Sequence, residues 1–206
     1  MQIVNFIKDS VVECSPFNWG LTLFSFGCNF HCKMCDGYNY EKVNDKNNIV
    51  GNAIEIIKDN ITPMHDCVIF LGGEPTIWGE KLKEALKYCH SLGLKTKIFS
   101  NGFNCATIED INNEKLCDAW SIDFKGLHNI QQEFGIPAQD YLMNIDYSIN
   151  DIARRKLPLE IRTTFYSGNE QWREDIKKYV EKTFLRKYPQ IKYIEQEDVR
   201  GIVKIK

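Results

Sequence analysis

Three closely spaced cysteines are the residues of this sequence with the clearest chemical potential. Cys28, Cys32 and Cys35 stand in the segment FSFGCNFHCKMCDGYN with the spacing CxxxCxxC, directly after an apolar run. Three thiolates on one short loop can hold three irons of a cubane iron-sulfur cluster and leave the fourth iron without a protein ligand. Such an open iron can bind a small molecule. A purely electron-transferring cluster or a structural zinc site would be expected to use a fourth protein ligand.

Two glycines and a glutamate follow the next apolar run, residues 67–71. Gly72 and Gly73 carry no Cβ atoms, so the backbone can pass close to a ligand at this point. Glu74 comes directly after them and can accept a charge-assisted hydrogen bond from an ammonium group. The alternative interpretation, an exposed surface glutamate, does not explain why Glu74 stands at the end of a strand.

Further polar residues accompany the later apolar runs. Ser100 and Asn101, in the segment SNGFN, indicate a tight turn that presents Asn101 to hydroxyl groups of a ligand. Asp123 and Lys125 lie on the same face of the segment SIDFK, because side chains two apart in a strand point the same way. We expect Lys125 and Arg162 to meet a carboxylate of the ligand, with Asp123 as their partner. A buried structural ion pair is the alternative.

The framework for these residues follows from the pattern of apolar segments. Six runs rich in β-forming residues lie at 21–26, 67–71, 94–99, 119–124, 159–166 and 191–194. Amphipathic helical patterns separate them, as at 79–90, 141–152 and 176–184. Alternating strands and helices predict an α/β fold whose parallel strands form a partial, open (β/α)6 barrel. Active sites of such folds lie at the carboxyl ends of the strands, where the polar residues above are found.

Length and composition limit the classes of protein. The 206 residues, 43% of them hydrophobic, can form one domain with a core of ordinary size. The 26 basic and 28 acidic residues give a net charge of -2, which excludes a general nucleic-acid or anionic-membrane binder. The N-terminus lacks the apolar run of a signal peptide, and no stretch reaches the roughly 20 apolar residues of a membrane span. We therefore expect a cytoplasmic protein.

Eight cysteines in a cytoplasmic chain indicate reduced thiols and metal binding rather than disulfides. The five outside the motif are scattered singly, and we expect them to be small buried residues or inert thiols. They are Cys14, Cys67, Cys89, Cys105 and Cys117.

The two main motifs together resemble the signature pair of the radical S-adenosylmethionine superfamily. That pair is a CxxxCxxC loop followed, after the next strand, by the sequence Gly72-Gly73-Glu74-Pro75. The resemblance implies a [4Fe-4S] cluster on the three cysteines, with its open iron chelated by the methionine part of S-adenosylmethionine. It also implies cofactor contacts for the other polar residues and for Met34, which stands where the superfamily often carries an aromatic residue beside the adenine. The implied cofactor-binding set is Met34, Gly72, Gly73, Glu74, Ser100, Asn101, Asp123, Lys125 and Arg162.

A narrower resemblance is to the activating enzymes of glycyl-radical proteins, above all the anaerobic ribonucleotide reductase activating protein. FIKDSVVE, SNGFN, DFKG, IRTTFYSG and YIEQEDVRG resemble ordered blocks of that family along most of the chain. The resemblance implies that a flavodoxin-like donor reduces the cluster and that S-adenosylmethionine is cleaved to a 5′-deoxyadenosyl radical. That radical would take a hydrogen atom from a glycine of a partner protein. Phe99 stands where related activases can carry an acidic residue.

Two other functions remain open from the sequence. The chain also resembles the 7-carboxy-7-deazaguanine synthases around the cluster loop, where Asp36 follows Cys35, but those enzymes usually carry Thr at the position of Gly37. The second alternative is a metal-binding or redox adaptor without catalysis. An adaptor has no use for the Gly-Gly-Glu motif.

Overall fold

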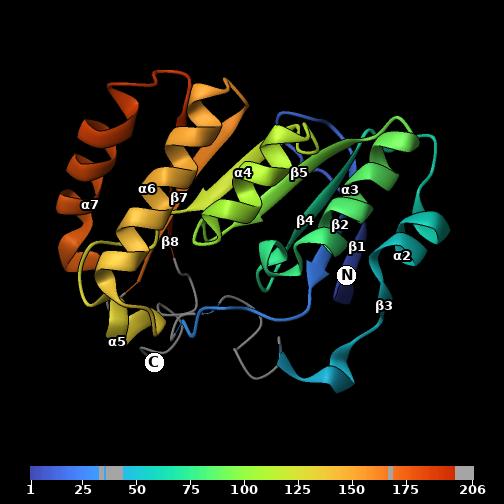
Figure 1. Cartoon of the computed structure of the whole chain (residues 1–206), viewed down its shortest axis with the longest axis horizontal. Helices are drawn as coiled ribbons and strands as arrows, with labels where there is room; N and C mark the ends of the chain where they lie inside the picture. Colours follow the sequence, from blue (N-terminus) through green and yellow to red (C-terminus); the bar gives the residue numbers. More distant parts are fainter. Residues whose placement is uncertain (33–34, 36–43, 167–168, 198–206) are drawn as a thin grey trace.

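One mixed sheet forms the frame of the molecule (Figure 1). The computed structural model describes residues 1–32, 35, 44–166 and 169–197. Within them the strands are β1 (Gln2–Ser10), β2 (Gly20–Ser25), β3 (Gly51–Asn52), β4 (Cys67–Gly72), β5 (Lys95–Ser100), β6 (Ala119–Asp123), β7 (Leu159–Phe165) and β8 (Lys192–Glu197). Their order across the 8-stranded sheet is β3-β1-β2-β4-β5-β6-β7-β8.

The six predicted apolar runs are the six parallel strands of this sheet. Strand β2 pairs in parallel with β4, and the parallel pairing continues through β5, β6 and β7 to β8. The predicted partial barrel of parallel strands is therefore confirmed. All six carboxyl ends lie at the same edge, which is the arrangement needed to bring the polar residues together.

The crossover helices form a layer over one face of the sheet, as Figure 1 shows for α3, α4, α6 and α7. The α-helices are α2 (Ala53–Asn60), α3 (Glu80–Ser91), α4 (Cys105–Asn113), α5 (Ile130–Phe134), α6 (Ala138–Arg154) and α7 (Arg173–Val180). Short 3-10 turns lie at Lys46–Asn48, Pro75–Trp78 and Glu170–Trp172, and a π-helical turn at Glu181–Leu185 extends α7. The three predicted helical patterns correspond to α3, to α6 and to α7 with its extension.

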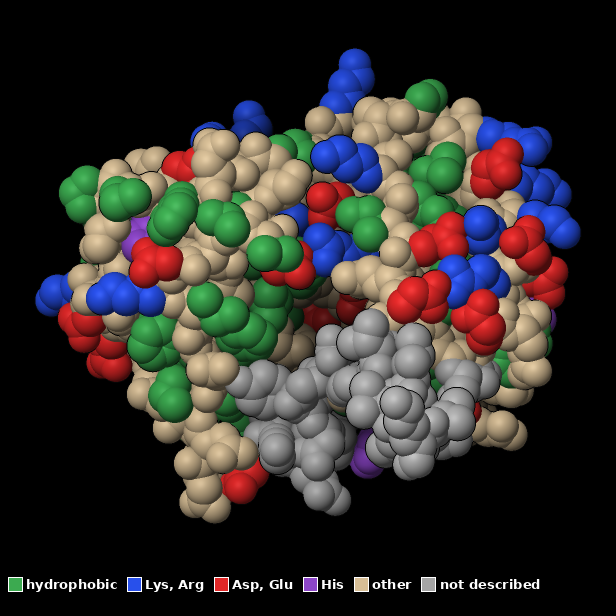
Figure 2. Space-filling model, turned by 180° about the vertical axis from the view of Figure 1, so that it is seen from behind, with side chains coloured by type: hydrophobic (Ala, Val, Ile, Leu, Met, Phe, Trp, Pro, Cys, Tyr) green, Lys and Arg blue, Asp and Glu red, His purple; other side chains and the backbone are tan. Residues whose placement is uncertain are grey.

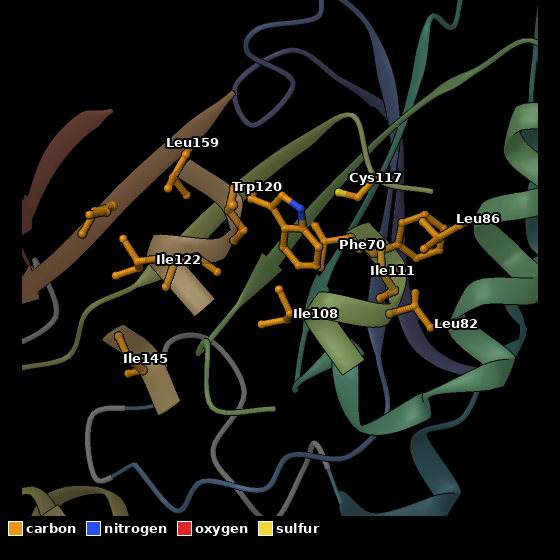
Figure 3. Packing of buried hydrophobic residues seen from close by; sticks show 14 of the residues in the cluster. Phe70, Leu82, Leu86, Ile108, Ile111, Cys117, Trp120, Ile122, Ile145 and Leu159 are labelled. Carbon is orange, nitrogen blue, oxygen red and sulfur yellow. The ribbon is translucent and has the colours of Figure 1, made fainter. Parts of the chain in front are cut away.

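The core lies between this helical layer and the sheet. Trp120 and Ile122 of β6 point into it with residues of α3 and α4 (Figure 3). The Trp120 indole donates to Asn112 Oδ1 at 2.9 Å, and the Asn112 amide donates to Asp151 of α6 at 2.8 Å. Because alternate residues of a strand face opposite sides of the sheet, the side chains of Trp120 and Ile122 point into the core and that of Asp123 points to the other face.

Strands β1 and β3 are absent from the sequence prediction. Strand β1 pairs antiparallel with β2, and its register shifts between Ile3 and Asn5 and between Ile7 and Ser10. Such irregularities break the two-residue alternation by which a half-buried strand is recognised in a sequence. Strand β3 has only two residues, Gly51 and Asn52.

The cysteines outside the motif behave largely as expected. Cys14, Cys67, Cys89 and Cys117 are buried, and Cys105 is partly buried. All are in the thiol form. In the part of the chain that the structure describes, no helix has both the length and the apolar character needed to cross a bilayer.

Candidate active site

A cavity of about 620 Å³ opens on the face of the sheet opposite the helices. Figure 2, which shows the molecule from behind relative to Figure 1, has a hollow near the centre of this face. Every predicted site residue within the described ranges lines the cavity: Cys28, Cys32, Cys35, Gly72, Gly73, Glu74, Ser100, Asn101, Asp123, Lys125 and Arg162. Met34 lies outside the described residues. The fold thus collects residues from the ends of β4, β5 and β6, from β7 and from the loop after β2, while their contacts with a cofactor stay predictions.

The three motif cysteines are partly exposed in the wall of this cavity. Burial, with a smaller contribution from the charge of Glu74, raises the pKa of Cys28 to about 12. Burial likewise raises the pKa of Cys32. These two thiols are therefore protonated at neutral pH when no metal is bound, and binding iron would displace their protons.

The chemistry of the donor set fits an iron-sulfur cluster. Cys28, Cys32 and Cys35 all line one cavity. Three thiolates around one space can each bind a different iron of a cubane, whereas a structural zinc site takes four protein ligands closed around one ion.

An aromatic anchor, which the sequence analysis missed, holds the cysteine loop in place. Phe30 is buried between Cys28 and Cys32 and packs against Phe103, Phe134 and Tyr141 with ring centroids 5.6 to 6.4 Å apart. The backbone N–H of the next residue donates to the Phe134 carbonyl at 3.0 Å. The loop is therefore fixed to α5 and α6 before any cofactor binds. An apolar residue inside a polar, cysteine-rich loop is the sequence signal that points to this anchor.

Glu74 connects the ends of two neighbouring strands. Its side chain is almost completely buried, and its Oε1 accepts from the Thr76 N–H at 3.1 Å, the Thr76 hydroxyl at 2.6 Å and the Ser100 hydroxyl at 2.8 Å. Its Oε2 accepts from the Asn101 N–H at 2.7 Å. Burial raises the pKa of Glu74, and these hydrogen bonds oppose that effect without cancelling it. Much of the carboxylate is thus committed to protein donors, and its predicted contact with an ammonium group would use the remaining position on Oε2.

We expect Glu74→Gln to lower the free energy of unfolding of the metal-free protein by about 2 kcal/mol. The new amide NH₂ must face a donor and leaves a buried N–H without an acceptor, which costs about 1–3 kcal/mol. Anaerobic denaturant titration measures the loss. Glu181→Gln is the control, since Glu181 is exposed and pairs with Arg186 only at the surface, where such pairs contribute under about 1 kcal/mol. Equal stability of the two variants would contradict the role of Glu74.

The two glycines differ in what they do. Gly72 has φ +108°, and a Cβ atom there would lie 2.6 Å from the backbone N of Ser25 and 2.7 Å from Cα of Phe24. Gly73 donates its N–H to the Ser25 carbonyl at 3.1 Å. Glycine is therefore required at position 72 because the backbone there passes close to strand β2. The sequence alone suggested that it passes close to a ligand.

Asn101 joins the end of β5 to the cysteine loop. Its Oδ1 accepts from the Phe103 N–H at 3.0 Å, which is the expected tight turn, and its amide donates to Asn29 Oδ1 at 2.8 Å. Gly102 follows with φ +73°. The predicted contact of Asn101 with ribose hydroxyls stays a prediction, since the side chain is buried and already bonded on both sides.

Asp123 and Lys125 form the expected ion pair at the end of β6. Lys125 Nζ lies 3.1 Å from Asp123 Oδ2, and the Lys125 backbone N–H donates to the Tyr141 hydroxyl at 2.7 Å. Burial lowers the pKa of Lys125, but the charge of Asp123 is the largest opposing effect, the hydrogen bond to its carboxylate adds to it, and the net result is a raised pKa. Lys125 is therefore a permanent cation beside the cysteines.

Arg162 does not share this partner, so the expectation that Asp123 pairs with both cations is wrong for Arg162. The guanidinium lies 2.8 Å from Glu13 and 3.0 Å from Glu160 and is stacked 4.6 Å above the centre of the Phe99 ring. Glu13 comes from the connection between β1 and β2, which has no local relation to Arg162 in the sequence. Arg162 therefore has two carboxylate partners of its own.

Comparisons with known proteins agree with this site. The sequence profile described as the Radical SAM superfamily matches residues 22–152, that is 131 of the 206 residues. A protein of Methanocaldococcus jannaschii, named as a candidate glycyl-radical enzyme activating enzyme, is 29% identical over 184 residues. That alignment covers 86% of this chain and 75% of the relative.

Solved structures show the same fold at low sequence identity. One of anSMEcpe with bound AdoMet superposes with a TM-score of 0.60 at 17% identity and covers 83% of this chain and 47% of that one. SuiB of Streptococcus suis, bound to the precursor peptide SuiA, gives a TM-score of 0.58 at 19% identity, with 90% and 40% covered. The chain thus spans about half the length of these proteins or less.

The profile match spans more than half of the chain and includes all three motif cysteines and the Gly-Gly-Glu segment. The partial barrel and the three thiols in one cavity at its strand ends agree with this match. The chain therefore belongs to the radical SAM superfamily, whose enzymes use a [4Fe-4S] cluster and S-adenosylmethionine.

Proposed function

We propose that this chain activates a glycyl-radical enzyme by removing a hydrogen atom from a glycine of that partner. The observation that carries the proposal is the similarity to the M. jannaschii protein, which extends over 86% of the chain. This alignment is longer than the region matched by the superfamily profile, residues 22–152. It therefore includes segments that the superfamily as a whole does not share.

The described residues suit this reaction. Cys28, Cys32 and Cys35 would hold the cluster, and the Gly73–Glu74 segment with Lys125 would bind S-adenosylmethionine beside it. When bound, the two groups supply a 5′-deoxyadenosyl radical that can abstract hydrogen from a Cα atom. The task of the chain is to hold the cofactors and the partner's glycine in a fixed geometry and to exclude water. The Phe30 anchor and the buried Glu74 provide this rigidity.

The partner that we propose is an anaerobic ribonucleoside-triphosphate reductase, and the reductant is a flavodoxin-like donor. The ordered blocks FIKDSVVE, SNGFN, DFKG and IRTTFYSG support this choice, because they resemble the activating protein of that reductase along most of the chain. YIEQEDVRG continues the series, but its last residues lie outside the described ranges.

The test uses the anaerobically reconstituted protein, S-adenosylmethionine, a reductant and a purified anaerobic ribonucleoside-triphosphate reductase. We expect 5′-deoxyadenosine in the chromatogram and a glycine-centred electron paramagnetic resonance doublet on the reductase. The doublet should be missing when the target glycine of the reductase is replaced by Ala. Formation of 5′-deoxyadenosine without a radical on the reductase, together with turnover of a pterin substrate, would instead favour a small-molecule enzyme.

A further inference from the structure

Three exposed apolar side chains stand at the mouth of the cavity. Ile7, Val11 and Val12 are 46%, 55% and 81% exposed, and all three line the cavity. In Figure 2 hydrophobic side chains gather on the side of the hollow where β1 and its neighbours lie, which is the left side of that view. Single exposed apolar residues are ordinary, but a group of them at a cavity mouth indicates a binding surface.

A buried hydroxyl without a partner belongs to the same wall. Thr22 lies opposite Ile7 in the register of β1 and β2, is 1% exposed, and lines the cavity. Its Oγ1 has no hydrogen-bond partner within the described structure. Buried polar groups are nearly always bonded, so a lone hydroxyl at a cavity wall calls for a ligand group. We name Ile7, Val11, Val12 and Thr22 the β1 wall.

The β1 wall is separate from the cofactor residues. Strands rise about 3.3 Å per residue, so Thr22 lies about 10 Å from the end of β2 at Ser25, where the cysteine loop begins. A ligand that satisfies Thr22 therefore lies nearer the amino end of β2 than a group held by the three cysteines.

This wall is fixed in position before anything binds. Glu13, next to Val12, pairs with Arg162 of β7 at 2.8 Å. Two residues farther on, the Ser15 carbonyl accepts from the fully buried Lys97 of β5 at 2.6 Å. A connection held at two points loses little conformational freedom when a partner docks on it.

A polypeptide suits this surface better than a small molecule does. A small molecule inside the cavity would leave Val12 in water, whereas a chain segment that enters the cavity from outside would cover all three apolar side chains. Strand β3 pairs with β1 only at Gln2 and Ile3, but farther along β1 the Lys8 carbonyl is already bonded to the His65 ring at 2.7 Å. The exposed apolar side chains, and not pairing with this edge, therefore favour a polypeptide.

We propose that the β1 wall binds the partner segment that carries the target glycine. This proposal rests on the function proposed above. Apolar side chains of the segment that lie several residues from the glycine pack on Ile7, Val11 and Val12, and a backbone group of the segment forms a hydrogen bond with Thr22 Oγ1. The glycine itself is then directed toward the cysteine end of the cavity.

The first test compares Val11→Asp and Val12→Asp with a matched control, Val50→Asp. Val50 is 56% exposed, nearly the same as Val11, and does not line the cavity. With a purified anaerobic ribonucleoside-triphosphate reductase as the probe, we expect the first two variants to weaken binding by about tenfold or more. The yield of glycyl radical per 5′-deoxyadenosine formed should fall in parallel. The control should stay within about twofold of the wild type.

A second test addresses the hydroxyl. Thr22→Val keeps the shape of the side chain and removes the donor, and it should weaken reductase binding by about fivefold, the size of one hydrogen bond. Thr22→Ser retains the hydroxyl and should restore most of the affinity, a recovery that a purely packing role of Thr22 would not produce.

The outcomes separate the two proposals. Wild-type affinity and radical yield in Val11→Asp, Val12→Asp and Thr22→Val would overturn the β1 wall while leaving the activase function in place. A wild-type protein that cleaves S-adenosylmethionine but puts no radical on the reductase would overturn the proposed function, and the β1 wall with it. Thermal unfolding of each variant verifies that it is folded.

Discussion

Replacing Cys35 by Ala is expected to abolish cluster binding and the cleavage of S-adenosylmethionine. Three thiolates are the minimum set that holds three irons and leaves the fourth open, so the loss of one leaves the cluster without a stable site. The rate of 5′-deoxyadenosine formation should fall by at least about 1,000-fold, which corresponds to about 4 kcal/mol of transition-state stabilisation. Iron analysis, the visible absorption spectrum and chromatography of the nucleoside measure the effect.

Cys105→Ala is the matched control for this experiment. Cys105 is also partly buried, but it begins α4 outside the cavity, where its Sγ donates to Asn144 Oδ1 at 3.2 Å. The control protein should keep its iron and its activity. If Cys35→Ala, with no cluster restored, still formed 5′-deoxyadenosine, the assignment of the three cysteines to the cluster would be wrong.

Gly72→Ala is expected to cause the largest loss of stability among single substitutions in the site. Its Cβ would lie 2.6 and 2.7 Å from backbone atoms of β2, and the residue has φ +108°. Because Ser25 and Gly72 are paired in the parallel ladder, β2 cannot move away without breaking that pairing. The combined strain and clash should lower the free energy of unfolding by about 3 kcal/mol or more.

Gly79→Ala separates the clash from the backbone strain. Gly79 also has a positive φ, +46°, but a Cβ atom there has nothing within 4 Å. That variant should lose only about 1–2 kcal/mol, the cost of placing an L-residue in a sparsely populated positive-φ conformation. Denaturant titration of both metal-free proteins gives the difference. Equal losses would show that the contact with β2 relaxes and that Gly72 is needed only for its dihedral angles.

Features of the fold that depend on neighbouring residues could be predicted from the sequence. The six parallel strands are short apolar runs, and helices α3 and α6 each carry an apolar stripe, such as the one from Leu82 to Cys89 in α3. Each of these patterns can be recognised from about a dozen consecutive residues. Strand β1 could not be predicted from the sequence, because its register shifts remove the alternation of apolar and polar residues that marks a strand. Its role in the site depends on its pairing with β2. The β1 wall was missed for the same reason, since Val11 and Val12 look like ordinary exposed residues until the cavity is known.

Side-chain partners that are close in the sequence could be predicted, whereas partners that are far apart could not. Asp123 and Lys125 are two residues apart on one strand face, and their ion pair followed from that spacing. Arg162 takes as its partner Glu13, which is 149 positions earlier in the chain, and Glu74 is held by Ser100 and Asn101 at the end of another strand. Such contacts depend on which strands the sheet places side by side and on how far a connection reaches over the barrel.

The amino-acid sequence by itself determined the order of strands and helices, the three thiols on one loop and the glycines beside them, because these features rest on spacing and local backbone preference. Only the tertiary structure decided which charges pair, why Gly72 must be glycine, and that an apolar wall with an unsatisfied hydroxyl lines the same cavity as the cysteines. The physical reason is that burial and hydrogen bonding at this site come from segments far apart in the chain, which meet only when the sheet curves into a partial barrel.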